Sequence, residues 1–189
     1  MSDRSQFSLR LATEDDIPAL RALVEASVRG LHADDYTQAQ IEGALGTALG
    51  VDSQLIRDRT FFIADAPADA ADGPMTMAGC GGWSNRKTLF GDDRRPGREP
   101  DLLDPAMDAA RIRAIFVHPA YARQGLGSLI LARVEAEAVN AGFRRFEMGS
   151  TLTGVKLYRL RGYREVGRID VPLANGEVVA VVKMVKRVE

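Results

Sequence analysis

A glycine-rich turn, Ala122–Gly127 with the sequence ARQGLG, carries the strongest chemical signal in the chain. Because Gly125 and Gly127 have no Cβ, backbone N–H groups in the turn can approach a ligand closely. The residues after the turn repeat apolar side chains at four-residue spacing, as an amphipathic helix does: Leu126, Ile130, Val134 and Ala138. The first N–H groups of such a helix have no intrahelical acceptor and lie at the positive end of the helix dipole. The turn is therefore predicted to bind phosphate oxygens.

Two better-known phosphate-binding motifs do not fit this turn. The Rossmann pattern requires Gly or Ala at the position that Ile130 occupies. A Walker A loop requires Gly-Lys-Ser/Thr, and the segment that comes closest, Gly149–Lys156, places Val155 between the glycine and the lysine. Taken alone, a GxG turn more often starts a helix that binds no ligand. The neighbouring segments are therefore needed to decide whether this turn binds phosphate.

The elements around the turn form one unit. The preceding segment, Ile112–Val117, is short, apolar and rich in β-branched and aromatic residues, which predicts a buried strand. His118-Pro119 ends this strand, because proline cannot donate a ladder hydrogen bond. Gly142 is placed to end the helix in a left-handed conformation. A second motif, GVKLYRLRGY, follows at Gly154–Tyr163.

With both motifs in view, the chain resembles the GNAT acyltransferase superfamily, whose members move an acetyl group from acetyl-CoA to an amine. The segment HPAYARQGLG is similar to the family's pyrophosphate-binding motif, Gln/Arg-x-x-Gly-x-Gly/Ala, and GVKLYRLRGYREVGR is similar to its x-x-LY-x-x-x-GF segment with the following strand. The resemblance covers residues Arg111–Arg168. Ala122 stands at the family's Gln/Arg position, a departure of small weight because backbone amides do most of the phosphate holding in the family.

The resemblance implies a fold of the α/β (α+β) class. Its twisted, mixed and mostly antiparallel sheet has six or seven strands, with helices on both faces. Two central parallel strands, here Ile112–Val117 and Phe146–Ser150, splay apart, and acetyl-CoA lies in the gap. Residues 1–189 are expected to form a single GNAT-like domain.

The resemblance also assigns roles to residues on the cofactor side. Tyr158 matches the tyrosine that protonates the departing CoA thiolate, a task for which a phenol is suited because it holds its proton at neutral pH. Thr151 stands where the family often has asparagine, and its hydroxyl could contact the pantetheine arm or the short helix. The residues expected to contact the cofactor are Phe116, Val117, Ala122, Arg123, Gln124, Gly125, Leu126, Gly127, Ser128 and Thr151.

The sequence says less about which residues would bind the acceptor amine. The candidate substrate contacts are Tyr36, Trp83, Phe90 and Glu147. For three of them another interpretation is at least equally good: Trp83 could pack in the core, Tyr36 could pack or lie on the surface, and Glu147 could simply be exposed. The same alternative of packing or a surface place applies to His32. Some relatives carry a glutamate base on the strand that matches Ile112–Val117, whereas this chain has Arg111 and Arg113 there. These arginines could prefer an acidic acceptor or pair with loop carboxylates. The sequence does not identify the general base; Glu147 is a candidate, and a water chain could carry the proton instead.

Ser84–Ala109 is predicted to be an irregular insertion, because it is polar and rich in glycine and proline. It is either a solvated charged face or a lid that places Leu89 and Phe90 over the substrate; the lid is preferred. In that case, the segment should be more mobile than the sheet and become ordered when both substrates bind.

Hydrophobic periodicity predicts the remaining elements. Helices are expected from the N-cap residue Thr13 to Gly30, from Thr37 to Leu45, and from Thr153 to Leu160 with Leu157 and Leu160 inward. Strands are expected at Phe7–Leu11, Phe61–Ala64, Met75–Trp83, Phe143–Ser150, Tyr163–Val171 and Val178–Val185, with turn signals at Ala71–Pro74 and Asn175-Gly176.

Composition narrows the class of protein further. The chain has 189 residues, of which 46% are hydrophobic and 27% charged, and its net charge is −1, so neither nucleic acid nor membrane is an expected partner. The single cysteine, Cys80, excludes an internal disulfide, and its apolar surroundings predict a buried, unreactive thiol. Two histidines, His32 and His118, are too few and too poorly spaced for a metal site. The N-terminus has no apolar run, so a cytoplasmic protein is expected, and a homodimer is left open.

The sequence thus favours an acetyl-CoA-dependent N-acetyltransferase that acts on a primary amine of a small molecule or peptide without a metal. The alternative is a non-catalytic acyl-CoA sensor or interaction module on the same fold, because fold does not fix function. The two differ in whether Tyr158 is needed for turnover or only for packing.

Overall fold

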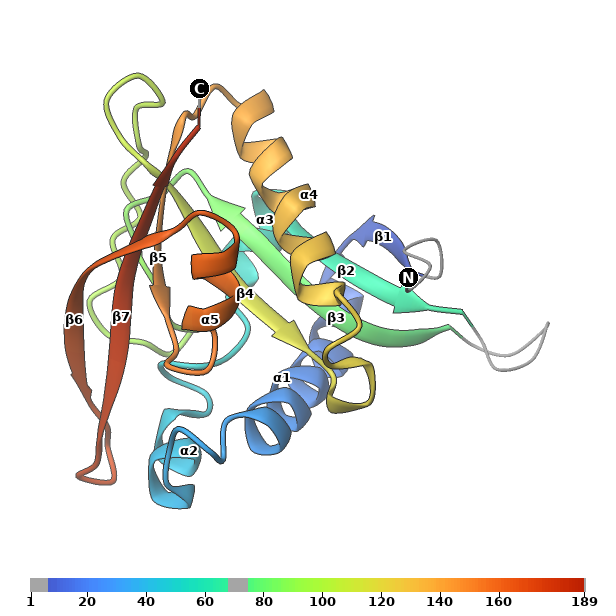
Figure 1. Ribbon diagram of the computed structural model, residues 1–189, viewed down its shortest axis with the longest axis vertical. Helices are drawn as coiled ribbons and strands as arrows, with labels where there is room; N and C mark the ends of the chain where they lie inside the picture. Colours follow the sequence, from blue (N-terminus) through green and yellow to red (C-terminus); the bar gives the residue numbers. More distant parts are fainter. Residues whose placement is uncertain (1–6, 68–74, 189) are drawn as a thin grey trace.

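The computed structural model describes residues 7–67 and 75–188 (Figure 1). The turn signal at Ala71–Pro74 lies outside the described residues. Seven strands form one sheet in the order β1-β2-β3-β4-β5-β7-β6. All neighbouring strands are antiparallel except β4 and β5, which confirms the predicted mixed, mostly antiparallel α/β architecture. The strands are β1 Ser8–Leu11, β2 Phe61–Ala66, β3 Thr76–Ser84, β4 Ala110–Val117, β5 Arg145–Ser150, β6 Arg164–Pro172 and β7 Val178–Arg187.

Helices cover both faces of the sheet (Figure 1). The α-helices are α1 Ile17–Leu31, α2 Gln38–Ala44, α3 Ser53–Arg57, α4 Leu126–Asn140 and α5 Val155–Leu160, and single 3₁₀ turns lie at η2 Glu14–Asp16 and η3 Pro119–Tyr121. The period-2 alternation of strand side chains divides the core between the two faces. In β2, Phe62 and Ala64 pack on the α4 face, whereas Phe61 and Ile63 pack against α1.

Local signals in the sequence start and end the helices. Thr13 forms a capping box with Asp16 at the start of the first helical turn, and Thr37 forms the same arrangement with Gln40 at the start of α2. At the other end of α4, Gly142 adopts φ +98° and follows the last helical turn, as expected of a C′ glycine. These caps fix where the chain enters and leaves the sheet layers.

Two expectations about the helices need correction. Leu160 does not point inward, because its side chain is 76% exposed and α5 ends there; the buried residue of this helix is Tyr158. Helix α3 was not anticipated, since its five residues are too few to show a periodic pattern.

The central feature of the sheet is the parting of β4 from β5. The two strands pair in parallel only at Ala110–Phe146 and Arg111–Glu147 and then diverge. A bulge interrupts the pairing of β3 with β4, where Ala114 adopts φ +51°. Bulges bend the strand that carries them, and the bent part of β4 borders the gap. The predicted splay of the two central parallel strands is therefore confirmed.

The segment between β3 and β4 has no regular helix or strand but folds back on itself. Arg86 forms an isolated antiparallel bridge with Leu102, and the N–H of Thr88 donates to the carbonyl of Glu99 over 3.2 Å. Within this segment, Phe90 and Leu103 are buried. The segment is thus packed on the sheet; whether it moves more than the sheet in solution stays a prediction.

A buried ion pair fastens this segment to β4. The guanidinium of Arg113 donates to the carbonyls of Thr88 over 3.0 Å and Gly91 over 2.8 Å, and to the carboxylate of Asp52 over 2.9 Å. The side chains of Arg113 and Asp52 are each only 2% exposed. Asp52 also accepts a hydrogen bond from Arg98 over 2.7 Å. One arginine therefore satisfies acceptors from two separate parts of the chain, the β3–β4 segment and Asp52 before α3.

We predict that Arg113→Met lowers the free energy of unfolding by about 2–4 kcal/mol, because it leaves Asp52 and two carbonyls short of a donor. Urea unfolding measures this loss, and hydrogen exchange of residues 88–100 should become faster. Arg94→Met is the matched control, because Arg94 lies in the same segment with a 72% exposed side chain and only a 3.7 Å contact to Asp92. Equal stability of the two variants would contradict the assigned role of Arg113.

Candidate active site

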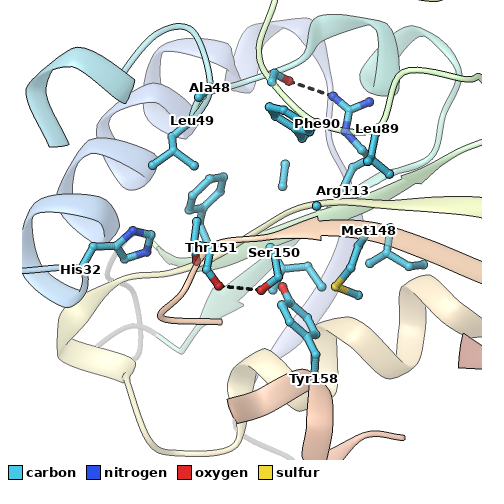
Figure 2. A pocket seen from close by; sticks show the side chains of 17 residues that line it. His32, Ala48, Leu49, Leu89, Phe90, Arg113, Met148, Ser150, Thr151 and Tyr158 are labelled. Carbon is cyan, nitrogen blue, oxygen red and sulfur yellow. Dashed lines mark hydrogen bonds between the residues drawn. The ribbon is translucent and has the colours of Figure 1, made fainter. Parts of the chain in front are cut away.

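A cavity of about 70 Å³ lies where β4 and β5 part (Figure 2). Both strands supply walls, and the other walls come from the end of α1, the segment before α3, the β3–β4 segment and α5. The lining residues are His32, Ala48, Leu49, Gly50, Leu89, Phe90, Gly91, Ile112, Arg113, Ala114, Ile115, Phe116, Met148, Gly149, Ser150, Thr151 and Tyr158. The splayed strands thus bring together residues from six separate parts of the chain.

Tyr158 projects from α5 into this cavity and lies beside Ser150 in Figure 2. Its ring is packed in the core and only 8% of the residue is exposed. Burial raises the pKa of its hydroxyl above the ordinary value of 10, so the phenol holds its proton at neutral pH. Within the described residues, the hydroxyl has no hydrogen-bond partner. The tyrosine therefore has a proton to donate, and no group among the described residues competes for it.

The glycine turn has the conformation that its sequence requires. Gly125 adopts φ +83° as the N-cap of α4, and Arg123 also has a positive φ of 61°. A Cβ on Gly127 would come within 3.1 Å of Leu157, so the glycine lets α4 approach α5 closely. His118 accepts a hydrogen bond from the N–H of Ala120 over 3.2 Å and so shapes the turn. The exposed turn presents the first amides of a 15-residue helix to solvent.

The other predicted cofactor contacts flank the turn and the gap. Phe116 and Thr151 line the cavity, whereas Val117 packs beside it. The Thr151 hydroxyl accepts a hydrogen bond from the N–H of Gly154 over 3.2 Å, so this side chain supports the entry into α5. Ser128, in the first turn of α4, accepts a hydrogen bond from Arg161 over 3.0 Å. The remaining predicted contacts, Ala122, Gln124 and Leu126, belong to the turn itself.

Of the four predicted acceptor residues, Phe90 alone lines the cavity, and the Arg95 guanidinium lies 3.8 Å from the centre of its ring. Tyr36 lies outside the lining. Its hydroxyl donates to the carbonyl of Ala180 over 2.9 Å and accepts from the N–H of Leu152 over 2.8 Å. Tyr36 therefore joins the α1–α2 connection to β7 and to the end of β5.

Trp83 and Glu147 are placed away from the cavity, which corrects both expectations. Trp83 packs edge-on against Phe143 in the core on the α4 face, with ring centroids 5.9 Å apart. The Glu147 carboxylate forms ion pairs with Arg111 and with Lys183. It is therefore held by two cations and is poorly suited to accept a proton. Arg111 and Arg113 both pair with carboxylates, but these are Glu147 of β5 and Asp52 at the start of α3 and not the expected carboxylates of the loop.

His32, which the sequence analysis weighed beside Tyr36 but did not choose as a site residue, lines the cavity. It lies just after α1, is 6% exposed, and lines the cavity across from Tyr158. Its ring makes no hydrogen bond to any described residue, and its Nδ1 atom is fully shielded. Burial lowers the pKa of the imidazole from 6.5 to about 4, with Asp35 opposing the shift. The sequence could not decide between a site role and packing for this residue, since its position depends on how α1 docks against β4.

His32 should make the folded protein sensitive to mild acid. The unfolded chain binds a proton at His32 below about pH 6.5, whereas the folded protein does so only below about pH 4. Its contribution is therefore complete above pH 6.5 and is lost as the pH falls to 4. We predict that the free energy of unfolding, relative to that of His32→Gln, falls by about 3 kcal/mol between pH 7 and pH 4. Parallel pH dependences of the two proteins in urea titrations would refute this prediction.

Two kinds of site are not found in the part of the chain that the structure describes. Among residues 7–67 and 75–188, no three His, Cys, Asp or Glu side chains are grouped so as to hold a metal ion. The helices in these ranges are too short or too polar to span a lipid bilayer. Cys80 is buried, as expected, and desolvation raises the pKa of its thiol to about 12.

Comparisons with known proteins agree with this geometry. Residues 105–187 match the family model described as the acetyltransferase (GNAT) domain. A GCN5-related N-acetyltransferase from Rhodopseudomonas palustris has 22% identity and a TM-score of 0.66, covering 96% of this chain and 95% of that one. The PaiA N-acetyltransferase of Thermoplasma acidophilum, solved with coenzyme A, has 13% identity and a TM-score of 0.60, with coverages of 96% and 98%.

A third solved structure, YncA from Salmonella typhimurium with acetyl-CoA, has 17% identity and a TM-score of 0.56, with coverages of 97% and 94%. No curated protein matches the chain. The resemblance to the GNAT superfamily is thus confirmed by the family model over β4 to β7 and by the fold over nearly the whole chain. This fold supports acetyl-CoA-dependent acetyl transfer in general.

Proposed function

We propose that this protein is an N-acetyltransferase that moves the acetyl group of acetyl-CoA directly to a primary amine of a small molecule or peptide, with both substrates bound together. The observation that carries the proposal is the unpartnered hydroxyl of Tyr158 in the gap between β4 and β5. A tyrosine that served only for packing would not need its hydroxyl at the edge of a polar cavity. The exposed glycine turn before α4 supports the same proposal from the phosphate side.

The proposed reaction needs one acid and one proton acceptor. The amine nitrogen bonds to the thioester carbonyl carbon, a tetrahedral oxyanion forms, and the carbon–sulfur bond breaks. The nitrogen loses one proton and the departing sulfur gains one, which Tyr158 supplies. Holding the amine and thioester in line in the gap supplies the entropic part of the acceleration. An amine attacks only in its neutral form, because an ammonium nitrogen has no lone pair, and none of the described lining residues is an Asp or Glu that could take its proton.

The turn around Gly125 is proposed to hold the CoA pyrophosphate through the N–H groups that begin α4. The cofactor contacts proposed with it are those expected from the sequence, except that Thr151 serves mainly to support α5. The amine acceptor would enter on the side of His32, Leu49 and Phe90. No metal is required by this mechanism.

We predict that Gly125→Val weakens the binding of CoA at least tenfold, a loss of about 1.4 kcal/mol. Gly125 has φ +83°, a conformation that a β-branched residue strains to adopt, so the turn and its amides should shift. Gly176→Val is the matched control, because Gly176 has φ +84° and equally open surroundings but lies between β6 and β7. Calorimetry should show near-parent affinity for the control; an equal loss in both variants would count against the turn.

We predict that Tyr158→Phe lowers the single-turnover rate of acetyl transfer about 10²-fold or more while the affinity for acetyl-CoA changes little. The phenylalanine ring keeps the packing and removes only the proton. The assay measures free CoA release with a panel of amines and peptides. A folded variant that transfers acetyl at the parent rate would remove Tyr158 from the mechanism. Acetyl-CoA binding without turnover on any amine would favour the alternative, a non-catalytic acyl-CoA sensor.

A further inference from the structure

His32 and Tyr158 are distinguished from the other polar side chains of the cavity by their free hydrogen-bonding capacity. Ser150 donates to the carbonyl of Thr151 over 2.7 Å, and the Thr151 hydroxyl accepts from Gly154. Arg113 is occupied by Asp52 and two carbonyls. Among the described residues, the ring of His32 and the hydroxyl of Tyr158 make no hydrogen bond at all. The Nδ1 atom of His32 is in addition fully shielded from solvent, and because a buried polar atom without a partner is unfavourable, it calls for an explanation.

The two unpartnered groups come from opposite sides of the gap. Tyr158 belongs to α5, which packs with α4 on one face of the sheet, and His32 ends α1, which packs on the other face. Figure 2 shows them on separate walls, with the His32 ring pointing toward Thr151. If Tyr158 of α5 donates the proton to the CoA sulfur, then His32 on the opposite wall lies on the side from which the amine would enter.

The groups around His32 keep its imidazole neutral. Asp35, three residues on, is the one charged group that raises its pKa, and burial outweighs this effect. Tyr36 packs beside the ring, with centroids 6.0 Å apart, and its hydroxyl is occupied elsewhere. Arg113, the cation on the far wall, is neutralised by Asp52. A neutral imidazole always carries one free lone pair, which can accept a proton.

We propose that His32 is the general base of the acetyl transfer and binds the acceptor's amine through a ring nitrogen. This inference rests on the proposed function and names a residue that neither the sequence nor the family resemblance assigns. As the nitrogen–carbon bond forms, the amine nitrogen becomes cationic and acidic, and His32 takes its proton. When the carbon–sulfur bond breaks, Tyr158 gives its proton to sulfur. Exchange with water then returns the His32 proton to solvent and a proton to Tyr158, leaving the amide and CoA–SH.

The experiment compares parent protein, His32→Ala and Tyr158→Phe in single-turnover acetyl transfer to the amine that releases CoA fastest in a panel. We expect His32→Ala to bind acetyl-CoA within about twofold of the parent and to lose about 10²-fold in rate. Added imidazole should restore part of the rate of His32→Ala and none of that of Tyr158→Phe. The restored rate should rise with pH as imidazole loses its proton, whereas the parent's His32 stays neutral over the same range.

Several outcomes would overturn the proposal. A folded His32→Ala protein with the parent rate would show that the imidazole takes no proton. A loss that imidazole does not restore, with unchanged folding, would assign His32 a packing role. These results would leave the N-acetyltransferase proposal intact, because the parent protein would still turn over. Failure of the parent protein to acetylate any amine would instead overturn both proposals.

Discussion

The loss of pairing between β4 and β5 is the constraint on which the rest of the site depends. Each strand keeps its outer neighbour: β4 pairs with β3 up to Val117, and β5 pairs with β7 up to Ser150. Beyond Arg111 and Glu147, the inner edges no longer hydrogen-bond to one another. Backbone groups in such a gap need other partners, because each unsatisfied buried group is unfavourable by about 1–3 kcal/mol. An extended ligand with amide groups of its own, such as the pantetheine arm of CoA, could hydrogen-bond to these strand edges in the way that an added strand pairs with a sheet edge.

Keeping the gap open requires support on both sides. On the β5 side, Tyr36 joins the connection after α1 to β7 and to Leu152. On the β4 side, the Arg113–Asp52 pair anchors the segment that carries Leu89 and Phe90 over the cavity. Buried ion pairs are weak sources of net stability compared with apolar packing, but their geometry is specific. The pair is therefore better understood as fixing where Phe90 lies than as adding stability to the fold.

The sequence predicted well those features that depend on neighbours along the chain. The cap at Thr13, the start of a helix at Thr37, the glycine turn and the terminating Gly142 are set by local backbone chemistry, so the sequence predicted them, although Thr13 caps a 3₁₀ turn and α1 itself starts at Ile17. The paired motifs also gave the sheet and its splay. In contrast, the sequence does not determine on which side of the sheet Trp83 packs. It also does not show that Glu147 forms an ion pair with Lys183 of β7.

The same distinction explains what was missed at the site. His32 reaches the cavity only because α1 packs across the sheet from α5, and the two lie more than a hundred residues apart in the chain. Nothing near position 32 records that contact. For Leu160, the sequence predicted burial that the structure does not show. Its spacing from Leu157 suggested a common buried face, but α5 has six residues and ends at Leu160, which stays exposed. Periodicity is informative only over helices long enough to repeat it.

The charge state of the cavity sets what can react there. Burial pushes the pKa of Tyr158 up and that of His32 down, so both groups are neutral across the physiological range. Arg113 brings a positive charge to the lining, but Asp52 lies against it. An alkylammonium ion entering this space would leave water without meeting a carboxylate, which is strongly unfavourable. Under the proposed function, the amine would therefore have to lose its proton before or during entry. In the proposed mechanism, the cavity walls would therefore favour the neutral amine, and the proposed base would remove only the proton that becomes acidic once the new bond forms.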